Sequence, residues 1–158
     1  MDVLAHMNQQ VQAIQVFSRI FEHALVLFGS EPEWAGRTGV YFCIADERGE
    51  PAVIARVGEP TKPEKYLAFC QEKAKRLAAH PEHVSSYQSR NPAQDHWGGA
   101  IRANYWLMAP SGAPELGDEA LVMGTAWVLR LADEDTLAAI AKYSNNPYWQ
   151  RLRDSLHR

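Results

Sequence analysis

The residues best suited to chemistry lie in one short span in the second half of the chain. Asp95-His96-Trp97-Gly98-Gly99 combines a carboxylate, an imidazole, an aromatic wall and flexible backbone. Adjacent side chains in an extended segment point in different directions, so the sequence does not establish Asp95 and His96 as a catalytic pair. The span is consistent either with a ligand-binding loop or with a loop whose histidine bonds to nearby backbone.

Two arginines flank this span, and a third lies far upstream. Arg90 and Arg102 could clamp a small carboxylate or phosphate through charge-assisted hydrogen bonds, or both could be solvated. Arg56 could pair with Asp46 or Glu59, or it could contact a ligand. The sequence therefore indicates an anion site on the loop from Arg90 to Arg102, with Arg56 as a further candidate.

Other kinds of site find little support. His80 and His83 would share a helical face only if the helix continued through Pro81, which disfavours a regular turn. The chain also has no cysteine and histidine spacing of a structural zinc site, no Gly-rich phosphate loop and no nucleophile elbow. We therefore expect no metal site, and the sequence leaves open whether the protein is an enzyme.

The composition is that of an ordinary globular domain. The chain has 158 residues, of which 46% are hydrophobic and 22% charged, and this length favours a single domain over residues 1–158. The net charge of -3 and the absence of a basic run argue against nucleic acid and membrane as partners. The N-terminal segment lacks a basic region, and its longest apolar run, Ala24 to Phe28, is too short for a signal peptide or a membrane span. Cys43 and Cys70 lie in apolar surroundings that favour buried free thiols, so we expect a cytoplasmic protein.

The hydrophobic pattern predicts a β-hairpin with helices laid against it. Residues 38–58 hold two apolar runs around the polar turn 46–49, and apolar residues on both alternating sets favour a central pair of strands. A long amphipathic helix is expected from Asp2 to Phe28, ended by Gly29 in the left-handed conformation. Its first turns either reach a partner subunit or lie along the monomer's own surface.

The remaining elements follow in order. Thr61 and Glu64 have the capping-box pattern for a helix that runs to about Ala79. A polar loop from Glu82 to Gly99 then leads to one expected strand, Ala100 to Ala109. Three helices complete the chain: a deeply buried one at Leu116 to Leu131, then Glu134 to Tyr143 and Tyr148 to Leu156. The predicted fold class is α+β, an antiparallel sheet flanked by helices, with a long N-terminal helix and a helical C-terminus.

Several short motifs occur in a fixed order between Val40 and Trp127. They are Asp46, Gly49 and Arg56 in the hairpin, Lys73-Ala74, Gly98-Gly99-Ala100-Ile101, and Ser111-Gly112 ahead of Asp118-Glu119-Ala120. In these motifs the chain resembles the GlcG/HbpS-like family of small α+β domains, which have a profilin- or PAS-like antiparallel sheet. The chain departs from the family at one place, because Gly98 to Ser111 leaves room for one strand where the family usually has a hairpin.

The resemblance implies a small-molecule-binding or sensory domain with no demonstrated catalysis. Family members include haem-binding and haem-degrading proteins, often homo-oligomers, so the implied ligand is anionic or a tetrapyrrole and the implied assembly a homodimer. No residue matches an axial haem ligand. The alternatives are a haem-binding or haem-degrading enzyme and a homodimeric interaction module with the first helix as its seam. The expected site residues are Arg56, Arg90, Asp95, His96, Trp97, Gly98, Gly99 and Arg102.

Overall fold

A four-stranded antiparallel sheet lies at the centre of the protein. The computed structural model describes residues 2–156 and has strands β1 (Gly39–Ala45), β2 (Pro51–Gly58), β3 (Ile101–Ala103) and β4 (Trp106–Ser111). The spatial order is β2-β1-β4-β3, so β1 and β4 are central and β2 and β3 form the edges. The predicted α+β fold with an antiparallel sheet is confirmed.

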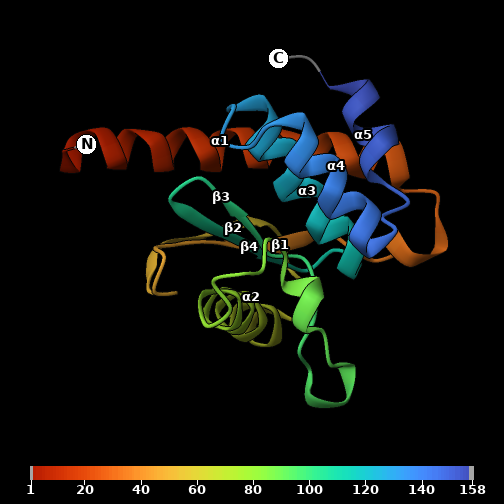
Figure 1. Cartoon of the computed structure of the whole chain (residues 1–158). Coiled ribbons are helices and arrows are strands. Elements are labelled where there is room, and N and C mark those ends of the chain that lie inside the picture. Colours follow the sequence, from red (N-terminus) through yellow and green to blue (C-terminus); the bar gives the residue numbers. More distant parts are fainter. Residues whose placement is uncertain (1, 157–158) are drawn as a thin grey trace.

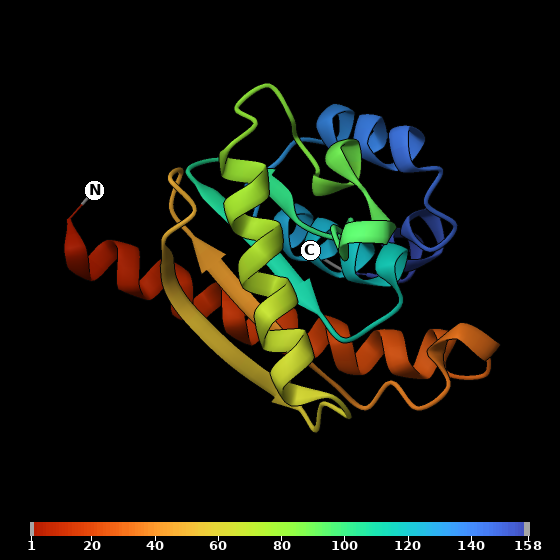
Figure 2. The ribbon, with the colours of Figure 1, turned by 90° about the horizontal axis from the view of Figure 1, so that it is seen from below.

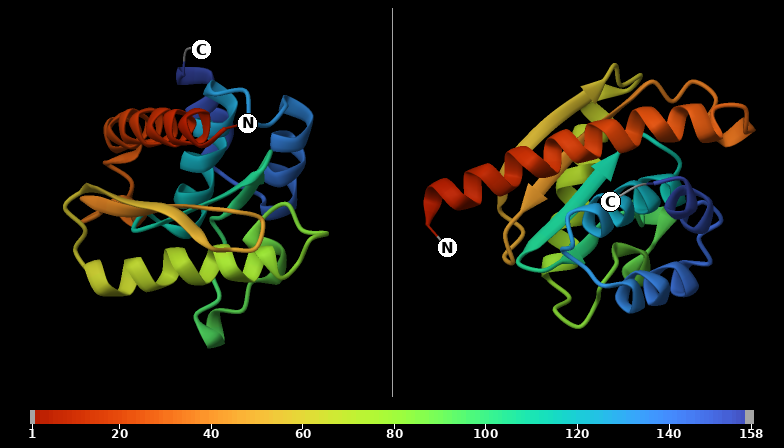
Figure 3. Two further views of the ribbon diagram at one scale, coloured as in Figure 1. Left: turned by 90° about the vertical axis from the view of Figure 1, so that its left-hand side faces the viewer. Right: turned by 90° about the horizontal axis from the view of Figure 1, so that it is seen from above.

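Five α-helices surround this sheet in layers. They are α1 (Val3–Phe28), α2 (Pro63–Ala78), α3 (Glu115–Val128), α4 (Glu134–Ser144) and α5 (Trp149–Ser155). Helix α2 covers one face of the sheet, whereas α1 and α3 cover the other, and α4 and α5 pack on α3 (Figures 1 and 3). The long N-terminal helix and the helical C-terminus are therefore as predicted.

Strand β1 supplies side chains to both layers because successive residues of a strand point to opposite faces. Phe42 belongs to the core that includes α1 and α3, and its ring stacks on Phe17 of α1 with centroids 4.1 Å apart. Cys43 belongs to a second core, formed with Cys70 and Leu77 of α2. Both cysteines are buried free thiols, as expected from their surroundings.

Helix α3 is the most deeply enclosed helix among the described residues. Every residue from Gly117 to Trp127 is buried. This confirms the expectation drawn from its nearly uniform apolar composition. The burial extends to Asp118 and Glu119, which are 2% and 0% exposed. Two carboxyl groups therefore lie inside the protein and need partners there.

The prediction of one strand after Gly98 was wrong, because this segment forms the β3–β4 hairpin. Ala103 pairs with Trp106, so Asn104 and Tyr105 make a two-residue turn. Asn104 has a φ of 58°, a left-handed conformation that asparagine tolerates better than most residues. The turn escaped notice because it lacks glycine and is flanked by apolar residues.

Three local expectations also need correction. The first hairpin is central only in β1, since β2 is an edge strand with mostly exposed or half-buried residues. Gly29 ends α1 in the right-handed helical conformation with a φ of -60°. Lys62, and not Thr61, occupies the cap position of α2 without a side-chain hydrogen bond. The hydroxyl of Thr61 instead lies 3.4 Å from the hydroxyl of Tyr66.

Helix α1 has the length and apolar composition of a membrane span, alone among the helices of residues 2–156. Such weak evidence also fits the core helix of a soluble protein. Phe17, Phe21 and Phe28 are buried on the inner side of α1 within this fold. Its N-terminal half extends past the sheet (Figure 1) and exposes Val3 and Leu4 by 75% and 67%.

Candidate functional site

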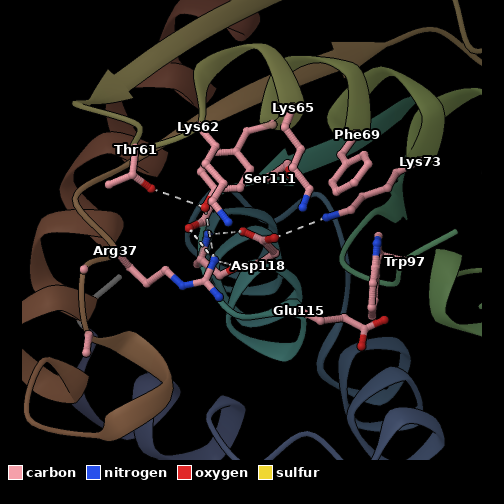
Figure 4. A pocket seen from close by; sticks show the side chains of 15 residues that line it. Arg37, Thr61, Lys62, Lys65, Phe69, Lys73, Trp97, Ser111, Glu115 and Asp118 are labelled. Carbon is pink, nitrogen blue, oxygen red and sulfur yellow. Dashed lines mark hydrogen bonds and ion pairs between the residues drawn. The ribbon is translucent and has the colours of Figure 1, made fainter. Parts of the chain in front are cut away.

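A pocket of about 430 Å³ opens beside the first half of α2. Its walls come from that helix, from residues 35–37 ahead of β1, and from residues 111–118, where β4 passes into α3. Figure 2 shows α2 lying across the sheet, and Figure 4 shows the pocket from close by. This volume is within the range of small-molecule sites.

Besides Lys73, three basic side chains reach the pocket, and they come from two segments. Arg37 comes from the connector before β1, and Lys62 and Lys65 come from the start of α2 (Figure 4). Pro63 lies between Lys62 and Lys65 and begins the helix, where a missing N–H costs nothing. The guanidinium of Arg37 donates to the carbonyl of Gly112 at 3.2 Å, which orients it towards the end of β4.

An aromatic wall stands next to these cations. Tyr66 and Phe69 project from α2, and Trp97 comes from the loop before β3. The amino group of Lys65 lies 5.5 Å from the centre of the Phe69 ring. Flat apolar surfaces beside basic groups favour a ligand that carries both a planar part and negative charge.

The carboxylate of Glu115 at the pocket rim is already bound by protein groups. Arg90 donates from Nε to both of its oxygens at 2.8 and 2.7 Å. The backbone N–H of Gly98 donates to the same carboxylate at 2.6 Å. The hydrogen bond to Glu115 raises the pKa of Arg90 above its ordinary value. The charge of Glu115 is therefore balanced by Arg90, and this carboxylate does not neutralise the basic groups across the pocket.

The carboxylate of Asp118 is likewise paired, with Lys73 at the pocket floor. The Nζ of Lys73 lies 3.2 Å from Asp118 and donates to the carbonyl of Pro110 at 2.7 Å. The side chains are 2% and 3% exposed. Burial raises the pKa of Asp118, and the ammonium group opposes that shift. Gly99, with a φ of 121°, packs so close that a Cβ there would lie 2.9 Å from Nζ.

The pairing of both acids leaves a net basic surface in the pocket. Within residues 2–156, no carboxylate forms an ion pair with Arg37, Lys62 or Lys65. A bound anion would gain three positive neighbours without displacing an existing protein carboxylate. The arrangement is therefore suited to binding an anion.

The structure places some of the sequence-predicted site residues at this pocket. Trp97 lines it, and Gly98 and Gly99 border it through their contacts with Glu115 and Lys73. Arg90 acts one step away, because it holds Glu115 and lies over the ring of Trp97. The structure therefore brings four of the predicted residues together at the pocket, although Arg90 is already paired with Glu115.

The other predicted residues lie elsewhere. Arg102 donates to backbone carbonyls at the end of α2, including that of Leu77 at 2.9 Å. His96 exchanges backbone hydrogen bonds with Asn91, and Asp95 sits in a left-handed turn with a φ of 57°. Arg56 forms an exposed ion pair with Glu59, one of the two partners expected for it. None of these four side chains lines the pocket.

Sequence reasoning missed the three basic residues of the pocket. Arg37 lies in a connector without a motif, Lys62 lies inside a capping-box pattern that indicates only a helix start, and Lys65 has the pattern of a solvated helix face. One signal was available, since both connectors contain glycine or proline and flank the first hairpin. It could not show that they meet at the end of β4.

Comparison of the chain with models of known protein families, with curated proteins and with solved structures found no match. The fold and the pocket therefore define the protein only as an α+β domain with a basic, aromatic-walled cavity.

Proposed function

We propose that this protein is a small-molecule-binding domain whose ligand combines a carboxylate or phosphate with a flat apolar part. The observation that carries the proposal is the convergence of Arg37, Lys62 and Lys65, none of them paired with a carboxylate in residues 2–156, on a pocket with an aromatic wall. Charge-assisted hydrogen bonds would hold the anion, and Tyr66 and Phe69 would cover the apolar part. A sensory or carrier role requires no catalytic group.

The resemblance to GlcG/HbpS-like domains supports the same proposal. Its motif residues Lys73, Gly99, Gly112 and Asp118 meet at the pocket, although they are far apart in the sequence. The sequence suggested one strand between Gly98 and Ser111, where the family usually has a hairpin. The structure has a hairpin there, β3–β4, so this difference from the family pattern disappears. Membership of the family and a cytoplasmic location stay predictions.

A screen by thermal shift tests the proposal, using small carboxylates, phosphates and tetrapyrroles. For the strongest hit, Lys65→Gln is expected to weaken binding by roughly ten- to a hundredfold, because one charge-assisted hydrogen bond is worth about 1.5–3 kcal/mol. Isothermal titration calorimetry measures the effect. The matched control is Lys75→Gln, on the same helix but outside the pocket. Equal losses in the two variants would refute a specific role for the pocket.

Haemin is the ligand that separates this proposal from the haem-enzyme alternative. Tyr66 is the one residue of a haem-ligating type among the described residues that line the pocket. Its hydroxyl faces Arg37 and Thr61, each at 3.5 Å or less. A Soret shift that disappears in Tyr66→Phe, together with bleaching of the haem when a reductant is added, would establish the alternative, whereas binding of haemin or of colourless anions without bleaching favours the proposal made here.

We also propose that the exposed half of α1 mediates homodimerisation. Leu4, Met7 and Val11 recur at steps of three and four residues and are 67%, 55% and 51% exposed. No Asp, Glu, Lys or Arg occurs from Val3 to Ser18, so two copies would meet without charge repulsion. Such a repeat is typical of helices that pair along one apolar stripe.

Sedimentation velocity tests the dimer. The wild-type protein is expected to sediment as a dimer, and the pair of substitutions Leu4→Glu and Val11→Glu should give a monomer, because they place charges in the seam. Val26→Glu, at an 86% exposed position near the other end of the helix, is the control. A monomeric wild type, or an unchanged dimer in the double variant, would contradict this use of α1.

A further inference from the structure

The turn that follows α2 brings two histidine rings together. Residues 80–83 read His-Pro-Glu-His, and the backbone N–H of His83 donates to the carbonyl of His80 at 2.9 Å. The two rings stack with centroids 4.6 Å apart and planes inclined by 11°. Sequence reasoning discounted this pair because Pro81 cannot continue a helix. A tight turn, which Pro81 favours, achieves the approach instead.

The carboxylate of Glu82 lies against both rings. Its Oε1 is 3.5 Å from Nδ1 of His80 and 3.6 Å from Nε2 of His83. One potential ligand atom from each of the three residues lies within 4.8 Å of the others. Tetrahedral zinc with bonds of about 2.0–2.2 Å separates its ligand atoms by roughly 3.3–3.6 Å. The two Glu82 separations match this range, whereas the nearly parallel imidazole rings must rotate about their side-chain bonds so that both nitrogen lone pairs point at one ion.

Burial determines which ring nitrogen of His83 an ion can reach. Its Nδ1 is buried and has no hydrogen-bond partner, so Nε2 is the ring nitrogen that an ion can reach. Neutral imidazole and ionised carboxylate are the protonation states that metals require.

Arg102 of β3 holds this turn in place. Its guanidinium donates to the carbonyls of His83 at 3.1 Å and His80 at 3.2 Å, in addition to that of Leu77. Two of these hydrogen bonds fix the turn to the sheet, and the third fixes the end of α2. A binding site that is ordered before its ligand arrives loses less conformational entropy on binding.

We propose that His80, Glu82 and His83 form a binding site for a divalent transition metal ion of the zinc class. Two imidazole nitrogens and one carboxylate oxygen suit zinc, cobalt and nickel, and they exclude a calcium-type site, which needs more oxygen ligands. Three protein ligands leave a fourth position for water or an exogenous group. The site lies at the C-terminal end of α2, whereas the basic pocket lies along its first half, so the two sites can be occupied independently.

Titration of the untagged, full-length protein with Zn²⁺ tests the proposal by calorimetry, with Co²⁺ as a spectroscopic probe. One ion per chain is expected to bind, with the intense visible absorption of a low-symmetry Co²⁺ complex. Glu82→Gln and His83→Ala should each weaken Zn²⁺ binding more than about tenfold. The matched control is His96→Ala, a histidine in the following loop outside the cluster.

Two controls keep the outcome interpretable. Glu82 is 66% exposed, so its substitution should leave the fold intact, and His83→Ala retains the backbone carbonyl that Arg102 binds. Circular dichroism checks both variants. The absence of Zn²⁺ binding, or a loss of affinity in His96→Ala equal to that in the two cluster variants, would overturn the proposal.

Discussion

Replacing Lys73 with methionine is expected to lower the free energy of unfolding at pH 7 by about 3–5 kcal/mol. The substitution leaves the Asp118 carboxyl buried without its cation and the Pro110 carbonyl without its donor. The loss is large compared with the total stability of a domain, which is about 5–15 kcal/mol. Urea denaturation measures it.

A double variant shows whether the pairing causes the effect. Lys73→Met combined with Asp118→Asn removes both charges, so it should recover part of the stability lost in the single variant. Lys75→Met, at an exposed position on the same helix, should change little. If Lys73→Met were no more destabilising than Lys75→Met, the buried ion pair would not support the pocket floor as described.

Stability is also expected to fall as the pH rises from about 4.5 to 7. Burial raises the pKa of Glu119 from 4.5 to about 7, against hydrogen bonds from Ser144, Asn146 and Ser85. The folded state therefore retains a proton in a pH range where the unfolded state has released it. The stability that this proton provides is complete below the pKa of Glu119 in the unfolded state. It is lost as the pH rises through the pKa of Glu119 in the folded state. A shift of this size corresponds to about 3 kcal/mol.

Glu119→Gln tests this assignment by urea denaturation at pH 5 and pH 8. The amide can still accept the hydrogen bond from Ser144 at 2.6 Å, but it does not ionise. The variant should therefore show a shallower decline with pH. Some decline should persist, because burial raises the pKa of Asp118 as well. A decline as steep as that of the wild type would show that Glu119 is not its source, and exposed Glu47→Gln serves as the control.

The sequence predicted the elements better than the site. Residue periodicity was sufficient for α1, β1 and the buried α3, because each presents long apolar runs whose spacing reflects one local geometry. The β3–β4 turn was missed because Asn104 and Tyr105 carry only a weak turn signal. The left-handed conformation of Asn104 can be recognised only once the pairing of β3 with β4 is known.

The site was harder to predict because it depends on tertiary contacts. Whether an arginine is available to a ligand depends on its partners, and Arg90 and Arg102 are occupied by Glu115 and by the turn after α2. Lys65 is exposed, as its position on the helix indicated, but the sequence did not show that it also lines a pocket. The turn containing His80 and His83 was judged by helical spacing, and it is not helical.

The central claim is that an anionic ligand binds in the basic pocket beside α2. Mapping of ¹H–¹⁵N chemical shifts on titration with the strongest screening hit tests this most directly. The account predicts shifts at Lys65, Phe69, Gly112 and the Trp97 indole, all at the pocket. Shifts confined to Asp95 and His96, with the α2 signals unmoved, would contradict it.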